Sequence, residues 1–257
     1  IDGPDGPIWV QTAGSGEPVT VFAHGVTGST GETAPLAAAT AGTSVLFDFR
    51  GHGRSSSPPP QAGYDHPAMR RDLQTVAGRF SATRAVGISM GAGAILNLCA
   101  DDPSRFERLV LITPASIDAP NAAAESLLLE MAERLERDGI EATLAWQLED
   151  NDVVHKRPYW RSMIQERTRR MNRDGVPRAL RAYVDGRPPI AEVAALRAIR
   201  APVLIVAHEG DPVHDAAVAR RLCSLLPSAT LRCFDEPLSQ WDDVGAFAAL
   251  IGEFLGS

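Results

Sequence analysis

Apolar residues in this chain form short runs, and segments with helical spacing lie between the runs. Uninterrupted apolar runs are typical of strands that are buried on both faces of a sheet. The segments expected to form strands are residues 8–12, 19–23, 44–49, 85–86, 108–113, 202–207 and 230–234. The segments expected to form helices are residues 32–40, 66–80, 92–100, 215–226 and 243–255. Strands that alternate with helices predict an α/β protein, whose mostly parallel sheet is covered by helices on both faces.

The pattern changes between residues 116 and 195. Strand-like runs are absent there, and apolar residues recur at helical spacing, as Leu127, Met131 and Leu135 do. We therefore expect a helical lid at residues 116–195, inserted into an α/β core that consists of residues 1–115 and 196–257.

Length and composition limit the class of protein. With 257 residues, 44% of them hydrophobic, the chain can bury one large core and a smaller lid. The net charge of −7 argues against nucleic acid as a partner. No apolar run is long enough to cross a bilayer, and there is no leader with a charged and then an apolar part, so no membrane partner is expected.

The three cysteines, Cys99, Cys223 and Cys233, are scattered and lack the spacing of metal ligands. Such a set is typical of reduced thiols in a cytoplasmic protein. We expect neither a metal nor a cofactor.

One short stretch holds a candidate nucleophile. Gly87-Ile88-Ser89-Met90-Gly91 follows a short apolar run and precedes small residues that favour a helix. A strand, a tight turn and a helix would hold the Ser89 hydroxyl at the apex, where side chains at the two glycine positions would collide with backbone. Backbone N–H groups at the head of the helix can stabilise an oxyanion there. Gly-x-Ser-x-Gly also arises by chance. The strand expected before it and the helix expected after it favour the interpretation of Ser89 as a nucleophile.

Four motifs, taken in chain order, resemble those of the α/β-hydrolase superfamily. They are His24-Gly25, Asp48-Phe49-Arg50-Gly51-His52-Gly53-Arg54-Ser55, the Ser89 motif and Gly210-Asp211, each directly after an expected strand. The resemblance covers essentially the whole chain apart from the expected lid. It implies an α/β-hydrolase fold, with a mostly parallel sheet flanked by helices and a helical lid insertion.

The resemblance also implies roles for particular residues. Ser89 would be the nucleophile, and the N–H groups of Val26 and Met90 would form an oxyanion hole. Asp211 would orient the histidine that takes the serine proton. The ordinary alternative for Asp211 is a turn residue before Pro212.

Two histidines, His24 and His52, fall on motif positions of the resemblance. They are expected to brace the loops around the site through hydrogen bonds and not to transfer protons. Their side chains remain candidates for the edge of the binding pocket.

The catalytic histidine is missing from its usual place. The family has it just after the last strand, but residues 234–243 contain none, and no histidine follows His214. Loss of a triad histidine costs roughly a million-fold in rate, which is about 8 kcal/mol of barrier.

One alternative is a histidine from elsewhere: His214, three residues after Asp211, or His155 in the lid. The ordinary interpretation of His214 is a solvent-facing residue near a helix start.

A second alternative is a carboxylate base. Glu236 stands roughly where the family's histidine belongs, and Asp211 should lie nearby. Two carboxylates in a dry pocket raise the pKa of one of them, which makes a workable acid or base. The ordinary interpretation of Glu236 is a loop acid that faces water.

A third alternative abandons hydrolysis. The superfamily includes non-hydrolytic enzymes, and hormone receptors that lack the histidine. The same pocket would then catalyse a cyclisation, rearrangement or elimination, or would bind a small molecule without chemistry.

The expected lid is rich in arginine. Residues 155–187 hold arginines at positions 157, 161, 167, 169, 170, 173, 178, 181 and 187. Most such runs are solvated helix faces. The alternative is a basic patch that attracts a carboxylate substrate or an acidic acyl carrier protein, with Trp146 and Trp160 as apolar walls of the binding site.

The leading hypothesis is a serine esterase-like enzyme with an altered triad. It would act through Ser89 on an ester, thioester or lactone, so the expected partner is a small-molecule carbonyl or acyl substrate.

Overall fold

The computed structural model describes residues 1–119, 122–149, 151–211 and 213–256. Seven of its strands are β3 (Val10–Gly14), β4 (Val19–Ala23), β5 (Thr43–Phe47), β6 (Arg84–Ile88), β7 (Arg108–Ile112), β8 (Val203–His208) and β9 (Ala229–Phe234). They form one sheet in the order β3-β5-β4-β6-β7-β8-β9. Only β3, at one edge, runs antiparallel to its neighbour. The prediction of a mostly parallel sheet is confirmed. A hairpin of β1 (Asp2–Gly3) and β2 (Gly6–Pro7) precedes it.

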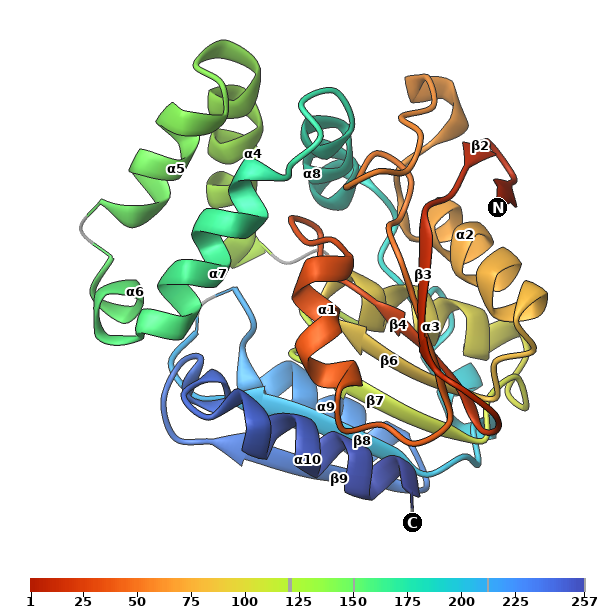
Figure 1. Cartoon of the computed structure of the whole chain (residues 1–257). Helices are drawn as coiled ribbons and strands as arrows, with labels where there is room; N and C mark the ends of the chain where they lie inside the picture. The colour runs from red at the N-terminus through yellow and green to blue at the C-terminus, as the bar shows by residue number, and fades with distance from the viewer. Residues whose placement is uncertain (120–121, 150, 212, 257) are drawn as a thin grey trace.

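Helices cover both faces of the sheet (Figure 1). The core helices are α1 (Thr30–Ala37), α2 (His66–Arg79), α3 (Met90–Asp101), α9 (Ala216–Leu225) and α10 (Val244–Gly256). On one face α1 packs against α10, and Leu36 joins Phe22 of β4 in an apolar cluster. On the other face Leu73 of α2 joins Val21 in a second cluster. Successive residues of β4 therefore enter opposite cores, which explains the uninterrupted apolar runs.

Five α-helices lie between β7 and β8 in the described part of the chain. They are α4 (Ala122–Arg137), α5 (Ile140–Leu148), α6 (Asp152–Lys156), α7 (Pro158–Arg169) and α8 (Gly175–Asp185), and we call them the lid. The lid lies over one end of the sheet (Figure 1). Within it, Leu144, Val154 and Ile164 form a small apolar cluster of their own. Residues 120–121 and 150, which belong to the expected lid, lie outside the described residues.

Short 3₁₀ helices complete the chain at η1 (Pro60–Ala62), η2 (Val193–Ala198) and η3 (Ser239–Trp241). Among the described helices, none combines the length and the apolar character that a membrane span requires.

The loop after β5 is fixed by two buried acids. Asp48 accepts the N–H of Thr30 at 2.6 Å and the N–H of Arg54 at 2.9 Å. Arg50 donates to both oxygens of Asp72 on α2, at 2.6 and 2.9 Å. A bidentate, buried pair of this kind holds one geometry, so the loop has a firm attachment to α2.

His66, the first residue of α2, is a buried titratable group. Its side chain lies against the ring of Tyr183, with 5.3 Å between ring centroids. Burial lowers the pKa of His66 to about 4, although the charge of Asp65 acts in the opposite direction. The imidazole is therefore neutral in the folded chain at pH 7.

We predict that His66 makes the fold less stable as the pH falls from 6.5 towards about 4. In that range the unfolded chain takes up a proton that the folded chain does not, so the free energy of unfolding decreases. The decrease due to His66 is about 2 kcal/mol between pH 7 and pH 5. Urea unfolding at both pH values should show a smaller decrease for His66→Leu than for the wild type. Equal decreases in both proteins would contradict the prediction.

Candidate active site

Ser89 lies in the turn between β6 and α3, and its backbone is strained. Its φ is 48° and its ψ is −106°, a region that residues other than glycine rarely adopt. The Ser89 N–H donates to the carbonyl of Ile112 at 2.9 Å, and its carbonyl accepts the N–H of Gly93 at 3.0 Å. A side chain at Gly87 or Gly91 would collide with neighbouring backbone. The strand, turn and helix that the motif predicts are therefore present.

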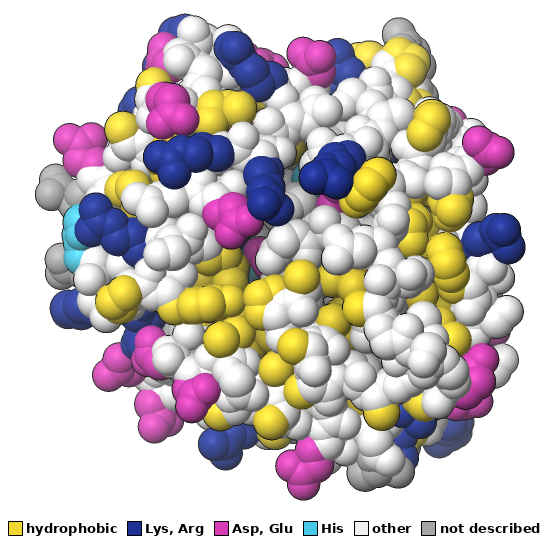
Figure 2. Space-filling model, in the orientation of Figure 1, with side chains coloured by type: hydrophobic (Ala, Val, Ile, Leu, Met, Phe, Trp, Pro, Cys, Tyr) yellow, Lys and Arg dark blue, Asp and Glu magenta, His cyan; other side chains and the backbone are white. Residues whose placement is uncertain are grey.

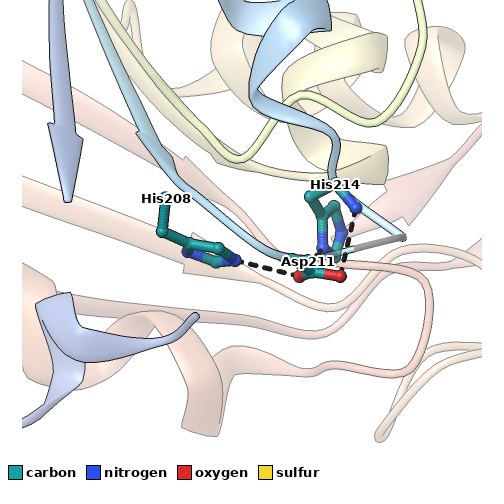
Figure 3. Close-up of side chains that lie close together, drawn as sticks. All are labelled: His208, Asp211 and His214. Atoms are coloured by element: carbon teal, nitrogen blue, oxygen red, sulfur yellow. Dashed lines mark hydrogen bonds and ion pairs between the residues drawn. The ribbon is translucent and has the colours of Figure 1, made fainter. Parts of the chain in front are cut away.

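An imidazole reaches the Ser89 hydroxyl. Nε2 of His214 lies 3.0 Å from Oγ of Ser89, and Nδ1 of His214 lies 2.9 Å from Oδ2 of Asp211. Because a carboxylate only accepts, Nδ1 carries the proton and leaves Nε2 free to accept the serine proton. Figure 3 shows Asp211 and His214 close together, on the loop that follows β8.

This loop holds its acid and its base three residues apart. Oδ1 of Asp211 accepts the N–H of Val213 at 2.7 Å and the N–H of His214 at 3.3 Å. The carboxylate thereby folds the chain back on itself, as in an Asx turn. Asp215 then caps α9 by accepting the N–H of Ala217. Residue 212, which belongs to the turn expected from the sequence, lies outside the described residues.

The environment of Asp211 favours its charged form. Burial would raise the pKa of this carboxyl, but hydrogen bonds from His208 and His214 outweigh burial and hold the pKa well below its ordinary value. The carboxylate therefore stays ionised throughout the neutral range, as a partner for an imidazolium must.

Glu236, the other base considered from the sequence, does not reach the site. Its side chain is 74% exposed and pairs with Arg157 of the lid at 2.8 Å. The loop after β9 points this residue outward, while Gln240 and Trp241 of η3 are buried and line the cavity described below. His155 is exposed on α6. The geometry therefore supports His214 as the base, and supports neither Glu236 nor His155.

Val26 and Met90 stand where the resemblance needs backbone donors. Met90 begins α3, so its N–H has no carbonyl one turn earlier within the helix. Val26 lines the same cavity as Ser89. The N–H of Val26 belongs to the same peptide group as the carbonyl of Gly25. That carbonyl accepts from Nδ1 of His24 at 2.7 Å and from the N–H of Gly28 at 2.9 Å. Two donors thus fix the orientation of that peptide.

His24 supports this loop from beneath and does not line the cavity. It is fully buried, and its Nε2 accepts the N–H of Phe49 at 3.0 Å. Burial lowers its pKa, so the ring is neutral, with Nδ1 as the donor. His52, also fully buried, has its ring nitrogens 2.8 and 2.7 Å from the carbonyls of Arg50 and Val26. Both histidines connect loops, as expected, but neither of them lines the cavity.

Ser89 and His214 face a cavity of about 540 Å³. The lid supplies much of its apolar wall, including Met131 of α4, Trp146 of α5 and Trp160 of α7. Both tryptophans named from the sequence are thus in the wall. Figure 2 shows basic side chains gathered over the lid and hydrophobic side chains across the middle of the same face.

Most of the lid arginines with described partners serve structure. Arg170, for example, follows α7 as its C-cap and pairs with Glu166 of that helix. Arg167 differs, because it lines the cavity, lies over the ring of Trp160 at 5.4 Å and pairs with Glu32 of α1 at 3.3 Å. Glu32 is buried and accepts the N–H of Gly25 at 2.8 Å. Arg167 therefore connects the lid to the loop that carries Val26.

Sequence reasoning missed His208, which reaches Asp211 from the end of β8. It is fully buried, its Nε2 lies 2.9 Å from the same Oδ2 of Asp211, and its Nδ1 lies 3.1 Å from Oε1 of Gln240 (Figure 3 shows the first contact). The sequence held a signal for His208. It is a polar residue at the end of an apolar run, and such folds place functional groups at the carboxyl ends of their strands.

Tyr183 of α8 is a second polar group in the cavity wall. Burial raises its pKa, against hydrogen bonds with Ser116 and Ser89. The phenol therefore keeps its proton near neutral pH.

His208, Asp211 and His214 are also a possible metal-ligand group, with ligand atoms within 4.8 Å of one another. Two imidazoles and a carboxylate are donors that zinc accepts. The direct hydrogen bonds among the three already account for their arrangement.

Comparison with known proteins agrees with this architecture. A model of the alpha/beta hydrolase family matches residues 20–253. A dihydrolipoyllysine-residue acetyltransferase component of an acetoin cleaving system, from Cupriavidus necator, is 29% identical over 258 residues, which cover 95% of this chain and 65% of that protein. The chain spans only 40% and 65% of the length of two curated relatives that it matches.

Solved structures show the same fold. An enol-lactonase from Burkholderia xenovorans LB400 has a TM-score of 0.80 at 20% identity, covering 97% of this chain and 96% of that one. A thermophilic esterase from Thermogutta terrifontis has a TM-score of 0.78 at 20% identity, covering 97% and 93%. The match over residues 20–253 shows that the chain belongs to the alpha/beta hydrolase family.

Proposed function

We propose that this protein is a serine hydrolase that cleaves an ester, thioester or lactone of a small molecule, with Ser89, His214 and Asp211 as its triad. The observation that carries the proposal is the pair of contacts of the His214 ring, 3.0 Å to Oγ of Ser89 and 2.9 Å to Oδ2 of Asp211. The triad is altered in one respect. Its histidine follows β8, three residues after the acid, and does not follow the last strand.

Acylation uses the three side chains in order. Nε2 of His214 removes the proton from Oγ of Ser89 as Oγ bonds to the substrate carbonyl carbon. The resulting oxyanion is held by the N–H groups of Val26 and Met90, and Asp211 stabilises the imidazolium. His214 then gives its proton to the leaving oxygen or sulfur, the bond to that atom breaks, and Ser89 carries the acyl group.

Deacylation repeats these steps with water as the nucleophile. Nε2 of His214 takes a proton from water, the new oxyanion uses the same N–H groups, and collapse of the intermediate returns the proton to Oγ of Ser89. With a lactone the leaving alcohol stays attached to the acyl group, so a single hydroxy acid is released.

The cavity fits this chemistry. Its volume of about 540 Å³ lies in the range typical of small-molecule sites, which combine apolar walls with a few polar groups. Trp146 and Trp160 provide such walls. The names of solved structures with the same fold include an enol-lactonase, an esterase and an N-acyl homoserine lactone degrading enzyme, which supports the substrate class.

The absence of a histidine after the last strand is the reason to consider a non-hydrolytic enzyme or a small-molecule binder. The contact between His214 and Ser89 removes that reason. Hydrolysis is therefore the function that the geometry supports best.

We predict that Ser89→Ala and His214→Ala each lower kcat for p-nitrophenyl butyrate by about 10⁵-fold or more, because either change removes the activated nucleophile. Labelling of the wild type by a fluorophosphonate should be fast, and Ser89→Ala should not be labelled. His155→Ala, which alters an exposed lid histidine, is the matched control and should keep wild-type turnover. Undiminished turnover in His214→Ala would refute the assignment of the base.

We predict that Asp211→Asn lowers kcat by about 10⁴-fold, because the amide can hold His214 in the wrong tautomer. In the wild type, hydrogen bonds keep the pKa of Asp211 far below neutral, so this carboxylate does not titrate between pH 5 and pH 9. Activity should fall towards low pH in a single step, because Asp211 contributes no step in this range. A kcat/KM profile with two acid steps in this range would contradict the prediction.

A further inference from the structure

Asp211 is the partner of two imidazoles. Its Oδ1 accepts the N–H groups of Val213 and His214, and its Oδ2 lies 2.9 Å from Nε2 of His208 and 2.9 Å from Nδ1 of His214. Two oxygens offer about four lone-pair positions, and all are used. The carboxylate that would serve the triad is therefore shared.

The proton on His208 can be located by elimination. Nε2 faces a carboxylate, so Nε2 carries a proton. A neutral ring then needs a donor at Nδ1, where the side-chain amide of Gln240 lies, with Oε1 at 3.1 Å. A half-turn of this amide places its Nε2 there instead, and that nitrogen is otherwise buried without a partner among the described residues. Gln240 thus holds the ring of His208, whose Nε2–H donates to Asp211.

We infer that His208 is a positioning residue that sets both the orientation of Asp211 and the share of its negative charge available to His214. This inference rests on the proposed function. Because the Nε2–H of His208 occupies one side of Oδ2, the carboxylate stays on Nδ1 of His214 and keeps the other ring nitrogen towards Ser89. The same hydrogen bond withdraws charge from Oδ2, so Asp211 attracts a proton on the His214 ring less strongly.

The remaining titratable and charged groups around His214 stay constant in the test. Besides Asp211 and His208, the cavity wall holds Tyr183 of α8, Arg167 of α7, Glu32 of α1 and Glu149, which follows α5. The test changes none of these four, so a shift in the pH profile reports the loss of His208 from its contact with Asp211.

The experiment compares two replacements of His208. His208→Leu removes the donor, whereas His208→Gln keeps an amide N–H near the place of the ring Nε2. For His208→Leu we expect kcat to fall by about tenfold to a hundredfold, because Asp211 loses its orientation. We also expect the acid limb of kcat/KM to move to higher pH by about half a unit to one unit. His208→Gln should return the limb to the wild-type position.

A role limited to packing would lower kcat or thermal stability in His208→Leu without moving the acid limb, and this outcome would overturn the inference. So would a limb in His208→Gln that matches His208→Leu. If His208→Leu does not fold, His208→Met, which also removes the donor to Asp211, takes its place. The acid limb should then move in the same direction, and an unmoved limb would overturn the inference.

Proton NMR separates this inference from the proposed function. The wild type should show two low-field imidazole N–H resonances, from His208 and His214, each bonded to a carboxylate. His208→Leu should lose one and His214→Ala the other. A wild type that shows both resonances but no labelling by a fluorophosphonate would refute the hydrolase alone. A wild type that is labelled but shows one resonance, kept in His208→Leu, would refute the role of His208.

Discussion

The backbone ladder of the parallel sheet places the turn that holds Ser89 close to the loop that follows β8. Ser89 donates its N–H to the carbonyl of Ile112 at 2.9 Å, and Thr113 donates to the carbonyl of Val206 at 2.7 Å. These bonds continue the ladder past the strand ends, from β6 to β7 and from β7 to β8. The turn that holds Ser89 and the loop that holds His214 are therefore in register before any side chain is considered.

Much of the fold and part of the site follow from the sequence. Strands such as residues 19–23 could be predicted because both of their faces enter a core. The role of Ser89 could be predicted because its turn needs glycine on either side. The identity of the base could not be predicted from the sequence. Whether His214 faces water or Ser89 depends on the turn that the Asp211 side chain makes with the backbone of Val213, and no spacing rule gives that direction.

The loop after β9 explains why Glu236, which stands roughly where the family's histidine belongs, does not reach Ser89. Leu238 has a φ of 62°, so the chain reverses there. Glu236 lies before this reversal and is drawn outward by Arg157, whereas Gln240 lies after it and turns inward to His208. A position in an alignment gives the place along the chain. The side of the loop to which a side chain projects is decided by local turns and by ion pairs with the lid.

The closeness of Asp211 and His214 along the chain has a thermodynamic consequence. Acid and base that come from successive strands must be brought together by ordering a whole helix and strand between them. Here a turn of three residues does so, and the entropy of closing a loop increases with its length. Their encounter is therefore a local event. Fraying of the C-terminal helix or of the sheet edge at β9 would leave this acid and this base in contact.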